Sequence, residues 1–144
     1  NYHPENSHVI PGLIRRFHEA KVNGDPEVIV WGTGKPKREF LYVDDIARAS
    51  VFVMGLDQET YQAHTDPMCS HINVGSGKDV TIEELAQLIK EVIQFEGRLI
   101  YDRRKSDGSP RKLMGSQRLL ELGWKPEVSL EQGLARAYKV FKAV

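Results

Sequence analysis

Segments with the apolar period of a helix alternate with short apolar segments along this chain, and that alternation limits its fold most. The strongest helix signal lies over 81–93, where Thr81 and Glu84 have the spacing of a capping box. Ser129 and Gln132 repeat that spacing before a last helix. Both helices carry an apolar stripe, which consists of Ile82, Leu85, Ala86, Ile89, Val92 and Ile93 in the first and of Leu130, Leu134, Ala137, Tyr138 and Phe141 in the second.

Further helices and short strands are expected around these two helices. A helix capped by Asn6 or Ser7 should end at Gly24, with an apolar face on one side. Asp44 or Asp45 should cap another helix, which ends near residue 55. Short strands are expected over 27–31, 38–43, 71–75 and 97–102. Helices that alternate with short strands predict an α/β fold class.

The composition excludes several classes of protein. The 144-residue chain has the length of one domain and carries 20 basic and 20 acidic residues. It lacks the basic excess of a nucleic-acid-binding protein, and no apolar run reaches the roughly 18 residues of a membrane span. Cys69 is the only cysteine, which excludes a disulfide framework. Nothing near it suggests an activated thiol, so we expect it to be a buried packing residue. The histidines do not have metal-ligand spacing, so no metal is expected. No dinucleotide-binding glycine motif occurs, so a dinucleotide site encoded by this chain itself is not expected.

Two loops combine small residues with cations and are the main candidates for ligand binding. The first spans 32–38 and the second spans 103–112. Glycine lets backbone N–H groups approach an anion, and arginine matches a phosphate with two hydrogen bonds. Composition alone favours the alternative, which is two solvated basic loops. Arg38 favours a ligand, because in the expected strand it shares a face with Phe40 and Tyr42.

Four further residues are candidates for a site, each with a simpler alternative. Arg16 lies at the margin of an apolar helix face, where an ion pair within the protein is equally compatible. Trp31 could stack on a base or sugar, although tryptophans at strand ends more often pack. Asp107 could accept two hydrogen bonds from a ribose or base, or form a turn. His8 begins a helix, whose positive end favours a neutral imidazole, but capping or packing is the simpler role.

Several stretches resemble the carboxyl-terminal half of one enzyme family. They are NSHVIPGLIRRFHEAKVNGDPEVIVWGTGKPKREFLYVDDIARAS, HINVGSGKDVTIEELA, KSDGSPRK and LGWKPEVSLEQGL. Together they are similar to the GDP-L-fucose synthases, which belong to the extended short-chain dehydrogenase/reductase superfamily. The resemblance runs over essentially the whole chain. It implies the substrate-binding portion of that α/β fold, without most of the Rossmann domain.

The resemblance also implies a reaction and residue roles. The family converts GDP-4-keto-6-deoxy-D-mannose to GDP-L-fucose by 3,5-epimerisation and NADPH-dependent 4-reduction. His8 would be the acid of the epimerase step and would lie near the nicotinamide of the cofactor. Contacts with the GDP-sugar would come from Arg16, Trp31, Arg38 and Asp107, with Lys112 as a weaker candidate.

Important parts of the family pattern are absent. The glycine-rich NADP turn, the catalytic serine, the Tyr-x-x-x-Lys pair and the reactive cysteine have no counterpart, and Cys69 does not match that cysteine. We therefore expect residues 1–144 to be a nucleotide-sugar-binding domain and a fragment of a longer, cytoplasmic, homodimeric enzyme. NADPH would bind mainly to the absent amino-terminal half, and this chain alone would be inactive. The alternatives are another nucleotide-sugar epimerase or dehydratase, or a non-catalytic binding module of the same fold.

Overall fold

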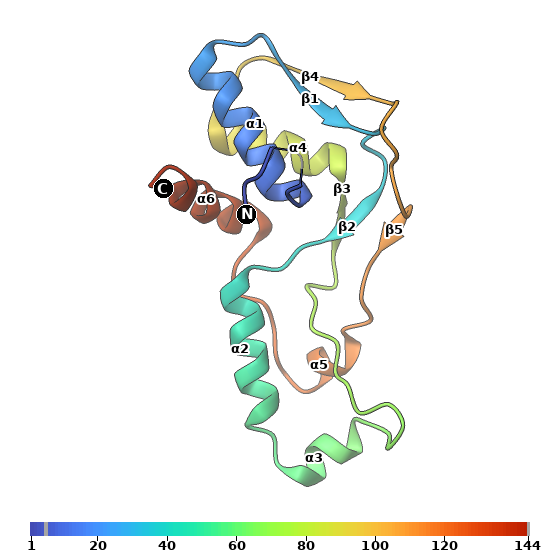
Figure 1. Cartoon of the computed structure of the whole chain (residues 1–144). Helices are drawn as coiled ribbons and strands as arrows, with labels where there is room; N and C mark the ends of the chain where they lie inside the picture. The colour runs from blue at the N-terminus through green and yellow to red at the C-terminus, as the bar shows by residue number, and fades with distance from the viewer. Residues whose placement is uncertain (5, 144) are drawn as a thin grey trace. The chain divides into compact units, whose positions relative to one another are not determined.

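A computed structural model describes residues 1–4 and 6–143, and the contacts between its segments divide it into two compact units. The first unit comprises Asn1–Lys37, Val80–Arg111 and Leu134–Val144, and the second comprises Arg38–Asp79 and Lys112–Gly133. Figure 1 shows the elements in chain order: α1 (Val9–Asn23), β1 (Glu27–Trp31), β2 (Lys37–Glu39), α2 (Val43–Met54), α3 (Gln58–Ala63), β3 (Asp79–Thr81), α4 (Ile82–Ile93), β4 (Arg98–Asp102), β5 (Arg111–Lys112), α5 (Gln117–Glu121) and α6 (Leu130–Phe141).

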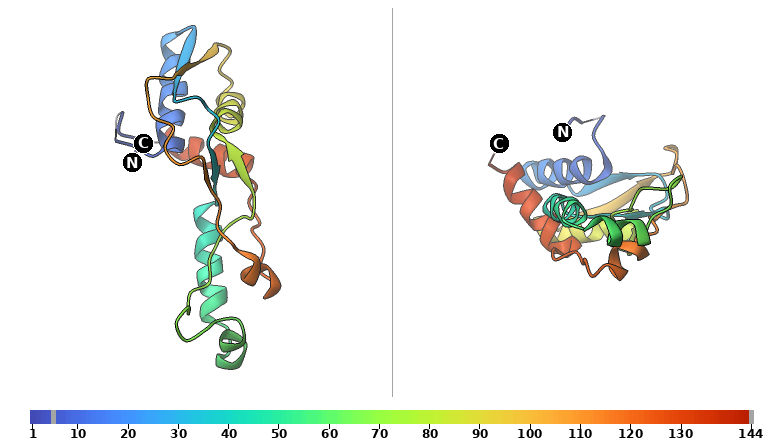
Figure 2. Two further views of the ribbon diagram at one scale, coloured as in Figure 1. Left: turned by 90° about the vertical axis from the view of Figure 1, so that its right-hand side faces the viewer. Right: turned by 90° about the horizontal axis from the view of Figure 1, so that it is seen from below.

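The first unit contains a pair of parallel strands with helices beside it. β1 pairs with β4 so that Trp31 lies opposite Asp102, the last residue of β4. Because the pair is parallel, both strands end at the same edge. From that edge the chain enters the 32–38 loop after β1 and the 103–112 loop after β4. α1 packs against β1 and α4 (Figure 2).

The core of the first unit follows the predicted helix faces. The predicted face of α1 is buried, and the Phe17 ring meets Phe95 edge-on with 5.6 Å between centroids. α1 ends as predicted, because Gly24 adopts the left-handed conformation with φ of 71°. Its beginning differs: the cap residue is His8 rather than Asn6 or Ser7. The buried apolar residues are Leu13, Ile14, Phe17 and Ala20 of α1, Val28 and Val30 of β1, Leu85, Ala86, Ile89 and Ile93 of α4, and Phe95 and Leu134.

The second unit has a core of its own around α2 and α5. Ala49, Leu119 and Trp124 are buried together there. Around them pack the half-buried residues Leu41, Phe52, Val53, Ile72 and Val74. Cys69 also belongs to this unit, but the prediction that it is buried is wrong. It is half-buried, and its Sγ lies 3.9 Å from Nδ1 of His71.

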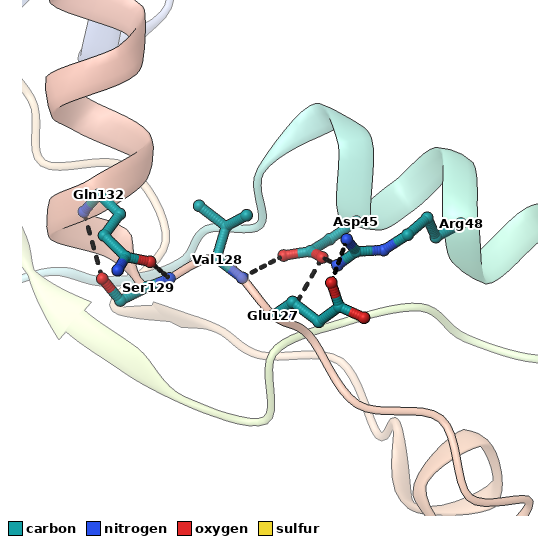
Figure 3. Close-up of polar contacts among 6 residues, drawn as sticks. All are labelled: Asp45, Arg48, Glu127, Val128, Ser129 and Gln132. Carbon is teal, nitrogen blue, oxygen red and sulfur yellow. Dashed lines mark hydrogen bonds and ion pairs between the residues drawn. The ribbon is translucent and has the colours of Figure 1, made fainter.

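Asp45 links α2 to the segment that precedes α6 (Figure 3). The predicted capping role of Asp44 or Asp45 is wrong, because Tyr42 is the cap residue. Asp45 is instead buried, and its carboxylate accepts hydrogen bonds from the backbone N–H groups of Glu127 and Val128, each at 3.1 Å. Arg48 forms ion pairs with both Asp45 and Glu127. The carboxylate thus supports a tertiary contact rather than the helix end.

The two predicted capping boxes are confirmed. Thr81 and Glu84 exchange hydrogen bonds at the start of α4. At α6, the Ser129 N–H donates to the Gln132 side chain and the Gln132 N–H donates to Ser129 Oγ, each at 3.2 Å (Figure 3). These bonds satisfy backbone donors that have no partner within the first helical turn.

Two predicted strands are shorter or missing. β2 ends at Glu39, so Arg38, Phe40 and Tyr42 do not form the expected strand row. Residues 71–75 form no strand among the described residues. The Glu39 carboxylate accepts hydrogen bonds from the backbone N–H groups of Gly77 (2.7 Å) and Met114 (3.0 Å). The Glu39 side chain therefore satisfies one backbone donor shortly after this segment and another at Met114, where a strand would use the backbone of a neighbouring strand.

β2 is the middle strand of a three-stranded sheet with the order β3-β2-β5. Helices with short strands confirm the predicted α/β class.

Candidate functional site

A pocket of about 180 Å³ in the first unit brings together three of the predicted site residues. The start of α1, the end of β1 and the start of α4 form its walls. His8, Arg16 and Trp31 all line it. The complete lining is Ser7, His8, Val9, Gly12, Leu13, Arg16, Val30, Trp31 and Ile82.

His8 is available at the start of α1. Its backbone carbonyl accepts the first helical hydrogen bond, from the N–H of Gly12 at 3.0 Å, while its side chain makes no capping bond. The residue is exposed. Ser7 packs closely against Gly12, where a Cβ would lie 2.8 Å from Ser7 Oγ. The imidazole therefore lines the pocket without taking the capping role that was its simpler alternative.

Arg16 and Trp31 form a cation–aromatic pair beside His8. The guanidinium carbon of Arg16 lies 4.0 Å from the centre of the Trp31 ring, and Nη1 donates to the Ile29 carbonyl at 3.3 Å. Partial burial lowers the pKa of Arg16 by desolvation. Trp31 is 42% exposed, and Nζ of Lys105 lies 5.0 Å from its ring centre. Positive charge and an aromatic surface that is open to solvent are thus combined in one place.

Arg15 provides the contrast with its neighbour. Arg15 forms an ion pair with Glu19, with 2.6 Å between Nε of the arginine and Oε1 of the carboxylate. The salt bridge considered as the alternative for Arg16 is therefore made one residue earlier. Within residues 1–4 and 6–143, the guanidinium of Arg16 has a backbone carbonyl and an indole as its partners, neither of which neutralises its charge.

Asp107 joins the two cationic loops. Its Oδ1 accepts a hydrogen bond from the Thr33 N–H and its Oδ2 accepts one from Thr33 Oγ1, both at 2.6 Å. Both hydrogen bonds lower the pKa of Asp107, and the bond from the hydroxyl has the larger effect. The positive charge of Lys35 lowers this pKa further. The carboxylate therefore holds the 103–112 loop against the 32–38 loop, rather than only forming a turn.

Arg38 and Lys112 belong to the second unit. Arg38 is half-buried in β2, and Lys112 is exposed in β5. Both strands are members of the three-stranded sheet, in which β2 and β5 are neighbours. The predicted participation of Arg38 and Lys112 in one site with Arg16 stays a prediction.

Sequence reasoning identified the loops 32–38 and 103–112 but did not single out Thr33 or Lys105 within them. Thr33 lies between two glycines with positive φ, Gly32 at 82° and Gly34 at 77°. A Gly-Thr-Gly turn after a strand was the available signal, since glycine lets neighbouring backbone groups approach a polar partner closely. Nothing local marks Lys105 out from the neighbouring basic residues of its loop.

The metal-ligating side chains and the lengths of the helices also bear on the kind of site. Among residues 1–4 and 6–143, no group of three or more His, Cys, Asp or Glu side chains could hold a metal ion. Within the same residues, the helices are too short or too polar to cross a membrane.

Comparison with solved structures supports the fold. A GDP-L-fucose synthetase from Naegleria fowleri is similar with a TM-score of 0.84 and 28% identity, over 99% of this chain and 41% of that one. A GDP-6-OMe-4-keto-L-xylo-heptose reductase from C. jejuni is similar with a TM-score of 0.87 and 28% identity, over 99% of this chain and 50% of that one. These neighbours confirm the predicted α/β fold of an epimerase/reductase portion.

Comparison with curated sequences identifies the family. The GDP-L-fucose synthase of Escherichia coli K12 is 57% identical over 141 residues, which cover 98% of this chain and 44% of that protein. GDP-L-fucose synthase 1 of Arabidopsis thaliana is 58% identical over 138 residues, which cover 96% of this chain and 40% of that protein. The chain thus spans less than half the length of these relatives, and the resemblance to GDP-L-fucose synthases is confirmed. The signature of the NAD dependent epimerase/dehydratase family matches residues 1–75, and the chain belongs to that family.

Proposed function

We propose that this chain is the nucleotide-sugar-binding part of an enzyme that converts GDP-4-keto-6-deoxy-D-mannose to GDP-L-fucose. The observation that carries the proposal is the identity of 55–58% with GDP-L-fucose synthases over nearly the whole chain. The reaction would be a 3,5-epimerisation followed by an NADPH-dependent 4-reduction. The complete enzyme would be a homodimer that acts in the cytoplasm.

The GDP-sugar would be bound by cations and one aromatic ring. Arg16 suits an anionic group, since its guanidinium can donate two parallel hydrogen bonds to a diphosphate oxygen pair. The exposed ring of Trp31 offers a surface on which a base or sugar can pack. Asp107 would accept hydrogen bonds from hydroxyl or amine groups of the nucleotide. Arg38 and Lys112 would supply further positive charge for the diphosphate.

His8 would act as the acid of the epimerase step. In that step a proton is removed from a carbon beside the 4-ketone and a proton is returned to the opposite face of the same carbon. His8 would return that proton, and its exposed position in the pocket supports this role. The base that removes the first proton is not assigned to a residue of this chain.

The residues of this chain do not fit a complete NADP(H) site. After β1 the chain passes through Gly32 and Gly34 into β2, whereas a dinucleotide turn leads into the N-terminus of a helix. NADPH, which would supply the hydride, would therefore be bound mainly outside this chain, and His8 would be its contact here. We expect the isolated chain to oxidise no NADPH with the keto-sugar, and measurable oxidation would refute that expectation.

A change at His8 tests the proposed reaction. In the complete enzyme, His8→Gln should abolish the exchange of solvent deuterium into C3 and C5 of the sugar, because no acid would return the proton. Mass spectrometry or NMR of the recovered sugar measures this exchange. Unchanged exchange would instead favour another nucleotide-sugar epimerase or dehydratase, in which this histidine has no acid role.

A pair of neighbouring arginines tests the binding site. Arg16→Gln should weaken the binding of GDP to the complete enzyme about tenfold, because a charge-assisted hydrogen bond is lost. Arg15→Gln removes the same charge one residue earlier, where Arg15 pairs with Glu19, and should leave the affinity unchanged. Isothermal titration calorimetry gives both affinities. Equal losses in the two variants would mean that only the overall charge matters.

A related reaction on a different GDP-sugar is the second candidate. The GDP-L-colitose synthase of Yersinia pseudotuberculosis is 35% identical over 94% of this chain. Turnover of the two corresponding keto-sugars by the complete enzyme would distinguish these functions, and the higher identity with GDP-L-fucose synthases favours the first.

A further inference from the structure

Thr33 and Asp107 make a paired interaction between two loops that are far apart in the sequence. They are 74 residues apart, and each oxygen of the Asp107 carboxylate has its own donor on Thr33. One donor is the backbone N–H and the other is the hydroxyl, both at 2.6 Å. Two hydrogen bonds to two oxygens fix both the position and the plane of a carboxylate, which one bond cannot do.

The Asp107 carboxylate lies close to the backbone of Gly32, which precedes Thr33. A Cβ on Gly32 would lie 2.2 Å from Oδ1 of Asp107, so a side chain at this position would displace the carboxylate from where it lies. The Gly32 N–H donates to the Asp102 carbonyl at 3.0 Å, which attaches the turn to the end of β4. The Thr33 hydroxyl also accepts a hydrogen bond from the Lys35 N–H at 3.3 Å, and so its own hydrogen is directed to Asp107.

The carboxylate keeps capacity for a ligand. An ionised carboxylate has about four acceptor positions, and Thr33 uses two of them. Asp107 is exposed, so the remaining positions are open to solvent. The hydrogen bonds from Thr33 also favour the ionised form, since they lower the pKa of Asp107.

An interaction of the same chemistry elsewhere has a local structural purpose. In α3, the Thr60 N–H and Oγ1 donate to the two oxygens of Asp57, both at 2.8 Å. Asp57 is three residues before Thr60 and caps that helix. The Thr33–Asp107 pair ends no helix and joins two cationic loops instead. Helix capping therefore explains the Asp57–Thr60 pair but does not explain the Thr33–Asp107 pair.

We propose that Thr33 is a positioning residue, which holds the Asp107 carboxylate in the orientation that accepts two adjacent donors of the bound nucleotide. This inference rests on the proposed function, because Asp107 acts on the nucleotide only if the chain binds one. Two adjacent donors occur in the vicinal diol of ribose and in the N–H edge of guanine.

The test measures the affinity of the complete enzyme for GDP by isothermal titration calorimetry. Thr33→Val keeps the size and branching of the side chain and removes the hydroxyl. It should weaken binding about tenfold, and Thr33→Ser should restore the affinity to within about twofold of the wild type. In steady-state turnover, Thr33→Val should raise KM for the GDP-sugar and leave kcat nearly unchanged, because the reacting carbons are not touched.

A double-mutant cycle separates positioning from a general loss of structure. Asp107→Asn should weaken binding at least as much as Thr33→Val, and the double variant should bind no more weakly than Asp107→Asn alone. Thr60→Val breaks the matched pair in α3 and should leave the affinity unchanged.

Each result has one meaning for the inference. If Thr33→Val binds GDP like the wild type, or if the two losses are additive, Thr33 does not act through Asp107, and the proposed function still stands. If the wild-type enzyme binds no GDP, both the function and the inference are wrong. The ribose diol would be identified as the ligand group if the wild-type enzyme binds 2′-deoxy-GDP more weakly than GDP while Asp107→Asn binds the two nucleotides equally. If the wild type and Asp107→Asn lose the same affinity on removal of the 2′-hydroxyl, the base edge would be identified instead.

Discussion

Asp45 offers the sharpest test of how the second unit is held together. Replacing it by asparagine keeps the size of the side chain but removes its charge and one acceptor oxygen. The amide group would then face a backbone donor, either that of Glu127 or that of Val128, where a carboxylate oxygen now accepts (Figure 3). Arg48 would at the same time lose its buried partner.

The expected cost follows from these contacts. A lost hydrogen bond to a charged group costs about 1.5–3 kcal/mol, and breaking a buried ion pair costs about 3–5 kcal/mol. The upper range does not apply, because the Arg48 side chain is 41% exposed and retains Glu127 as a partner. We therefore expect Asp45→Asn to lower the free energy of unfolding by about 2–3 kcal/mol.

Urea unfolding of the chain, followed by far-UV circular dichroism, measures this loss. Asp44→Asn is the matched control, since Asp44 lies in the same helical turn but is exposed. Loss of a charge near a helix N-terminus costs only about 0.3–1 kcal/mol. If the two variants differ by less than about 0.5 kcal/mol, the contacts of Asp45 with residues 127–128 do not stabilise the fold, and the reasoning fails.

Two further outcomes are expected. Gly34→Ala should lower the thermal unfolding temperature, since Gly34 has φ of 77° and a Cβ would lie 2.6 Å from Cε1 of Tyr101; an unchanged transition in differential scanning fluorimetry would show that this turn adapts. The pKa of Asp107 is depressed in the folded state, so the stability contributed by its bonds is present above its unfolded pKa and is lost as pH falls through its folded pKa. In an NMR titration, the chemical shift of the Thr33 amide proton should follow the protonation of Asp107. A midpoint at or above the ordinary aspartate range would contradict the depressed pKa of Asp107.

Helix signals could be read from the sequence because they are local. The capping boxes at the starts of α4 and α6 each involve residues three positions apart, and both form as predicted. Gly24 ends α1 for the same reason, since the left-handed conformation depends on one residue.

Strand signals failed where a partner was needed. The segment 71–75 alternates apolar and polar residues, and Ile72 and Val74 do pack on the core as such a pattern predicts. A strand also requires a neighbour with unpaired backbone groups, which alternation does not reveal. For the same reason β2 ends at Glu39, although its apolar pattern continues to Tyr42.

By itself the sequence determined the positions of α1, α2, α4 and α6, the α/β class and, through its resemblance to GDP-L-fucose synthases, the residues to inspect. Only the tertiary structure showed that Arg16 stacks on Trp31 beside His8, and that Asp107 is held by Thr33. The physical reason is the parallel pairing of β1 with β4, which brings two loops to the same edge although about seventy residues separate them. Contacts over such a separation depend on how strands pair, and no local pattern of residues encodes that pairing.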